Sequence, residues 1–185
     1  ERLTQQVFHE MQQEEAREEE RRLDNLYRRL RKDDDSQTQR SLRRLRELYE
    51  RFREDDRWMR AVDRSSAVEI AGTVKNLFAA CVVSLERSLE LWEAAERMTT
   101  PAARDSILAQ RRELLSEVQA SIDQFALTVD EVHALALQKT GVDDLATFRH
   151  DLDRSLDVAR KVEERMQRLE SELRQSPEGL HREDA

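Results

Sequence analysis

Two carboxylate–histidine pairs are the residues in this chain whose types and spacing could bind a metal. Glu178 with His181, and Asp130 with His133, lie three positions apart, a spacing that brings side chains together on one helix face. A carboxylate-bridged di-metal centre in a bundle needs two Glu-x-x-His motifs on neighbouring helices and two further glutamates. The first pair follows a proline and contains a glycine, so we expect it outside a helix. The second offers aspartate instead of glutamate, and we therefore predict no metal site.

Other catalytic patterns are missing from the sequence as well. Cys81 is the single cysteine and lies in the apolar run 79–83, so we expect a small core residue in a reducing, cytoplasmic compartment. With three glycines in the whole chain, no glycine-rich phosphate loop and no Gly-x-Ser-x-Gly elbow can be built. The sequence thus predicts a non-enzymatic protein with no catalytic residue, no cofactor and no small-molecule substrate.

Two heptad ladders indicate the elements that organise the chain. A 3.5-residue repeat keeps one apolar seam on a partner helix over its whole length. Thr140-Gly141 separates the ladders and is typical of a helix end, so an antiparallel hairpin is expected. The first ladder is Leu115, Val118, Ile122, Phe125, Val129, Val132 and Ala136, and the second is Leu145, Phe148, Leu152, Ser155, Ala159, Val162, Met166, Leu169 and Leu173.

Helix start and stop signals divide the chain into about five helices. Capping boxes at Ser36 with Gln39 and at Ser66 with Glu69 predict the starts of the second and third helices. The predicted helices cover about 2–32, 36–62, 66–98, 101–139 and 143–175. We expect an all-α, elongated antiparallel helical bundle, or coiled-coil hairpin. Its predicted parts are a highly charged helical arm at 1–64, a three-helix coiled-coil bundle at 65–176 and a polar tail at 177–185. The two helices of the arm either complete the bundle or project from it.

Two features qualify this picture. The second helix is expected to bury Leu42, Leu45, Tyr49, Phe52, Met59 and Val62 along one face.

In the third helix, Gly72 falls within the broadest apolar stripe, although glycine in a helix costs about 1 kcal/mol relative to alanine. The close approach of a neighbouring backbone is the favoured explanation of Gly72, and a kink is the alternative.

Composition and charge limit the classes of partner. Charged residues make up 39% of the chain and aromatic residues 5%, as in long helices with a narrow core. Residues 1–64 hold 17 basic and 17 acidic side chains, so the remainder carries the net charge of −8. An acidic body repels nucleic acid and anionic membranes. The longest uncharged stretch near Cys81, 76–85, is too short to cross a bilayer.

Two clusters are candidate interaction sites. An apolar cluster lies at the start of the chain, separated from the next large hydrophobic residues by a long polar run, so a second copy is its simplest cover. This candidate self-association site consists of Leu3, Val7, Phe8 and Met11. A second cluster is rich in arginine and could meet phosphate, although a solvated, salt-bridged face is the commoner outcome. This candidate anionic-partner patch consists of Arg40, Arg43, Arg44 and Arg46.

These features predict a coiled-coil scaffold or protein–protein interaction module that binds a protein partner or itself. A long helical hairpin with an extra charged helix is also similar in outline to phage-shock protein A and to ESCRT-III-like membrane-coat proteins. That resemblance implies an alternative function, a peripheral membrane-coat or stress protein. A third reading is a nucleic-acid-associated protein that uses the arginines of segment 40–46.

Overall fold

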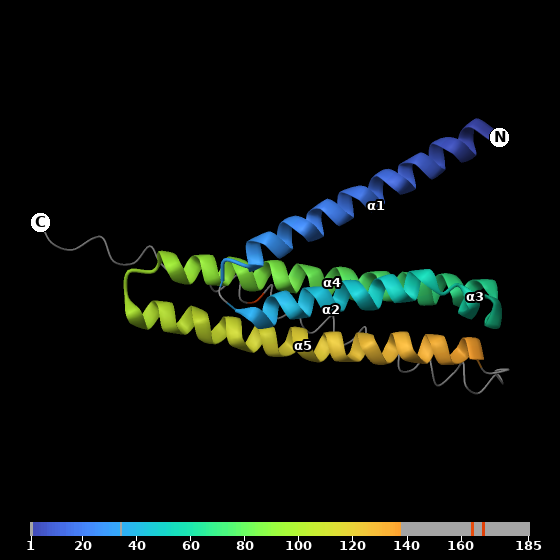
Figure 1. The fold of residues 1–185 in the computed structure, drawn as a ribbon. Helices are drawn as coiled ribbons and strands as arrows, with labels where there is room; N and C mark the ends of the chain where they lie inside the picture. Colours follow the sequence, from blue (N-terminus) through green and yellow to red (C-terminus); the bar gives the residue numbers. More distant parts are fainter. Residues whose placement is uncertain (1, 34, 138–163, 165–167, 169–185) are drawn as a thin grey trace, which may run out of the picture.

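The computed structural model describes residues 2–33, 35–137, 164 and 168. Within the described ranges the chain forms five helices and no strand: α1 (Arg2–Leu30), α2 (Ser36–Glu54), α3 (Arg57–Ala61), α4 (Arg64–Arg97) and α5 (Pro101–Leu137). The helices α4 and α5 pack against each other in antiparallel directions along the bundle, and α2 packs on both (Figure 1). The predicted all-α antiparallel bundle is therefore confirmed. Of the predicted fifth helix only residues 164 and 168 are described, and the second ladder and the tail lie outside the described residues.

The first ladder is buried, as predicted. Its positions from Leu115 to Val132 are all at most 7% exposed, and Ile122 and Phe125 are fully enclosed. They pack with the apolar stripe of α4, which includes Leu77, Phe78, Leu85 and Leu89. The seam thus faces a helix that precedes it in the chain, and the predicted hairpin across Gly141 lies outside the described residues.

The predicted length of the second helix is wrong. It ends at Glu54, because Asp55 adopts an extended conformation with φ −96° and ψ 97°, and the short α3 follows. The break changes which side chains turn inward. Met59 is 47% exposed, whereas Trp58 is 1% exposed and stacks on Phe52 with ring centroids 5.2 Å apart. Met59 is therefore not a core residue, and Trp58 takes that place.

Aspartates, not the predicted serines, cap the helices at both predicted starts. Asp35 Oδ1 accepts a hydrogen bond of 3.0 Å from the Gln37 amide at the start of α2. Asp63 Oδ1 accepts one of 3.0 Å from the Ser66 amide, so α4 begins at Arg64, two residues before the predicted start. Aspartate and serine are about equally good caps, so a serine close to an aspartate leaves the choice open in the sequence.

One core joins the residues on both sides of Arg64. Leu42, Leu45 and Phe52 of α2 belong to the same buried cluster as the seam of α5, and Tyr49 stacks on Phe78 of α4 at 4.1 Å between ring centroids. Near its C-terminal end α1 adds three leucines to this cluster: Leu23, Leu26 and Leu30. The predicted division into an arm and an independent bundle remains a prediction, and α2 is packed as part of the bundle.

Helix α4 shows two faces. Its stripe from Ile70 to Ala95 is buried, as expected of the central helix, but Gly72 is exposed and a Cβ atom built there would meet nothing within 4 Å. The predicted close approach of a backbone to Gly72 is thus wrong. By length and composition α4 could cross a bilayer, but half of its most apolar window is buried inside the bundle, as in the core helix of a globular protein.

Candidate functional site

The predicted arginine patch lies on α2, and part of it is neutralised. Arg46 reaches α1, where Nη1 lies 2.8 Å from Asp24 Oδ1 and Nη2 pairs with Glu20. Arg44 pairs with Asp123 of α5 at 3.1 Å. Carboxylates of the chain itself thus hold two of the four arginines.

The other two arginines of the patch form no ion pair with a carboxylate in the part of the chain that the structure describes, although Glu47 lines the same surface depression. Arg43 donates a hydrogen bond of 3.1 Å to the Tyr27 hydroxyl, and Arg40 lies exposed beside Gln37 and Gln119. Together they line an open depression of about 510 Å³. This leaves two neighbouring cations on one helix, a smaller anionic-partner site than predicted.

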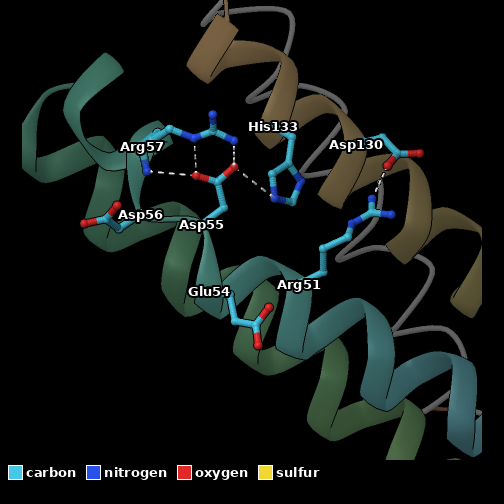
Figure 2. Close-up of a pocket in the computed structure, with 7 residues that line it drawn as sticks. All are labelled: Arg51, Glu54, Asp55, Asp56, Arg57, Asp130 and His133. Atoms are coloured by element: carbon cyan, nitrogen blue, oxygen red, sulfur yellow. Dashed lines mark hydrogen bonds and ion pairs between the residues drawn. The ribbon is translucent and has the colours of Figure 1, made fainter.

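A second depression, of about 640 Å³, lies where α2, α3 and α5 meet (Figure 2). Asp55 is at its centre because the break between α2 and α3 turns this side chain toward α5. Arg57 donates to Asp55 through its amide at 3.1 Å and through Nε and Nη2 at 2.8 and 2.7 Å. These donors hold the pKa of the Asp55 carboxyl well below its usual range.

His133 faces Asp55 from α5, with 3.6 Å between Nε2 and Oδ2 (Figure 2). Its other ring nitrogen, Nδ1, lies 2.7 Å from the Val129 carbonyl oxygen and donates to it, because a carbonyl only accepts. A neutral His133 then carries its lone pair on Nε2, toward the carboxylate. Only the protonated ring can donate to Asp55.

The Asp130–His133 pair of the sequence does not converge on a shared ion. Asp130 pairs with Arg51 of α2, and His133 turns toward Asp55 instead. Among the described residues no three histidine, cysteine, aspartate or glutamate side chains are placed to hold a metal. Among the described residues that line this depression there is no hydroxyl or thiol that the Asp55–His133 pair could activate as a nucleophile.

A buried ion pair at the α1–α2 turn was not predicted. Arg111 Nη2 lies 2.6 Å from Asp33 Oδ2, and the two side chains are 9% and 0% exposed. Arg111 Nε also donates to the Ser88 carbonyl oxygen at 3.1 Å, and the Asp35 amide donates to Asp33 Oδ1 at 3.0 Å. Burial raises the pKa of Asp33, whereas the Asp35 amide and the Arg111 cation oppose that rise. This pair ties the turn to α4 and α5.

The sequence did contain a signal for Arg111. It lies four positions before Leu115, so it occupies the seam position that precedes Leu115 in the first ladder. A charged residue at such a position is buried with a partner or lies beyond the end of the seam. The ladder predicts that Arg111 is buried, but the residue with which Arg111 pairs depends on how α1 and α2 pack.

The candidate self-association cluster lies in the N-terminal half of α1. Figure 1 shows this half of the helix leaving the bundle, while the C-terminal end of α1 stays on it. The backbone is helical at Leu3, Val7, Phe8 and Met11, and their side chains lie outside the described part of the structure. Self-association through this cluster therefore stays a prediction.

Cys81 is buried, and burial raises its pKa to about 12. A thiol in that state is a core residue rather than a nucleophile. Within the described part of the chain, the surface features are thus the arginine patch, the depression at Asp55 and the projecting half of α1, and the Asp33–Arg111 pair lies inside. Comparisons with protein families, with curated proteins and with solved structures found no match to this chain.

Proposed function

We propose that this chain is a non-enzymatic coiled-coil module that binds other copies of itself, or another protein, through the N-terminal half of α1. One observation carries the proposal. Of the 29 residues of α1, the three buried leucines at 23, 26 and 30 attach it to the bundle, and the preceding half extends away from it (Figure 1).

A helix in that position is suited to binding. Most helical stability in proteins comes from packing of an amphipathic face rather than from helix propensity, so packing against a partner would stabilise the extended half of α1. The exposed residues of its middle, among them Glu14, Arg17 and Glu18, keep it soluble and leave the apolar cluster at its start as the anchor. Symmetric pairing of two copies is the commonest way in which such a patch is covered.

The arginine patch gives less support to a phosphate-bearing partner. Arg44 and Arg46 already pair with carboxylates, and residues 65–185 carry the net negative charge of the chain. Like charge repels nucleic acid and anionic lipid. A protein partner in the cytoplasm, where a lone thiol stays reduced, is the proposal that fits these charges.

The proposal is tested by comparing the sedimentation of the full chain with that of a chain that lacks residues 1–12. The full chain should be a dimer or larger at micromolar concentration, and the shortened chain should be a monomer. A point variant refines the test, because Val7→Gln removes an apolar side chain while Glu14→Gln, on the same helix, does not. Equal sedimentation of all four proteins as monomers would remove self-association from the proposal.

A further inference from the structure

Two arginines fix the register of α1 on α4. Arg22 Nε and Nη2 lie 2.9 and 2.7 Å from the carboxylate oxygens of Glu86, and Arg29 Nη2 lies 3.2 Å from Glu93 Oε1. Each pair joins positions that differ by 64. The two helices therefore run parallel, in constant register, where they touch.

The face of α4 that holds these glutamates continues toward its N-terminus without cover. Successive residues turn by about 100° around a helix, which places Val68, Gly72, Ala79 and Val83 on the same side as Glu86. All four are exposed, Val68 by 69% and Val83 by 41%. Open space lies over Gly72. The half of this face that α1 leaves bare is mostly apolar, with Lys75 between Gly72 and Ala79, whereas the half that it covers is acidic.

We infer that the N-terminal half of α1 closes onto this bare face of α4, in the register that the two arginine pairs set. That register brings position 4 to Val68 and position 8, a phenylalanine, to Gly72. A glycine with open space above it is the place on this face that best admits an aromatic ring. Closure continues an existing helix–helix contact by four turns and creates no new type of contact.

The closed helix would be autoinhibitory, and in this respect the inference rests on the proposed function. In the closed position, segment 3–11 would cover residues of α4. The same segment is proposed to bind a partner. Figure 1 shows the open position, in which the N-terminal half of α1 leaves the bundle. The polar middle of α1 adds little apolar contact, so closure is reversible and a partner can compete with it.

Cross-linking between single cysteines tests the register. The variant with Thr4→Cys and Val68→Cys, treated with a short bismaleimide, should give an internally cross-linked monomer at a rate independent of protein concentration. Thr4→Cys with Val83→Cys is the off-register control, since these positions on α4 lie about 22 Å apart. Cys81 is buried, and the two single variants measure any background from it.

A substitution at the docking point tests the role of Gly72. Gly72→Gln fills the open space, so it should lower the cross-linking rate several-fold, and it should raise the denaturation midpoint because glycine is a poor helix former. Ser116→Gln, on an exposed position of α5, should leave the cross-linking rate unchanged. An unaltered rate in Gly72→Gln would overturn the inference.

Two other outcomes are decisive. Cross-linking no faster than in the off-register pair would overturn the inference, and so would products that are only dimers, which would place the segment on a second copy. Sedimentation tests the proposed function separately from the closure of α1. A chain that cross-links internally but is monomeric at every concentration supports closure and removes self-association. If both ideas hold, Gly72→Gln should increase the dimer fraction.

Discussion

Replacement of Arg111 by methionine should destabilise the protein strongly, because it leaves a buried carboxylate without its counter-charge. The Asp33 side chain is fully enclosed, and Arg111 is the cation that contacts it. Breaking a buried ion pair by removing one partner costs about 3–5 kcal/mol. Asp33 would keep the Asp35 amide at 3.0 Å and the Thr38 hydroxyl, 3.1 Å from Oδ2, so the lower end of that range applies. We expect a loss of about 3 kcal/mol.

Urea denaturation followed by circular dichroism measures this loss. The matched control is Arg44→Met, which breaks an ion pair whose two side chains are both about half exposed. Exposed pairs contribute about 0–1 kcal/mol, so the control should lose little. The double variant Asp33→Asn with Arg111→Met buries no charge, and it should be more stable than Arg111→Met alone. If Arg111→Met loses no more than the control, the pair is not a buried structural contact.

Three further predictions follow from the core and from the Asp55 depression. Phe125→Ala should cost roughly 3–5 kcal/mol in denaturation, because Phe125 is fully buried, whereas Gln124→Ala should be nearly silent; similar losses would contradict the seam. Cys81, with its pKa raised to about 12 by burial, should react with thiol reagents only after unfolding, and rapid labelling of the native protein would refute its burial. The Asp55 pKa is lowered, so its stabilisation is present above pH 3.8 and lost as pH falls further. Asp55→Asn should therefore be less stable than the wild type at neutral pH, with a difference that disappears in strong acid.

Periodicity predicted the buried seam of α5 because one helix in isolation determines it. Every described ladder position from Leu115 to Val132 is buried, since a 3.5-residue repeat reports a continuous contact whatever the partner is. The sequence does not identify the partner helix. Two apolar stripes of similar period fit one seam equally well in sequence, and α4 packs on α5 in the structure.

The errors have two physical causes: neighbouring residues of similar chemistry compete, and contacts between distant residues leave no local pattern in the sequence. The helical period of α2 continues through Met59, but two adjacent aspartates favour a break, and α3 then presents Trp58 instead. The Asp33–Arg111 pair joins residues 78 positions apart, and no local spacing encodes it. The Asp55–His133 contact was missed for the same reason, since it depends on the break in α2.

The ion pair at Asp33 has a mechanical consequence for α1. It holds the turn directly after the last residues of the helix, while the other end is unsupported, so α1 acts as a lever with its fulcrum near Leu30. From Leu30 to Arg2 the lever is about 42 Å long, and a tilt of about ten degrees at the fulcrum moves its tip by about 7 Å. A displacement of less than a bond length at the buried pair is thereby enlarged several-fold at the segment that is proposed to bind a partner.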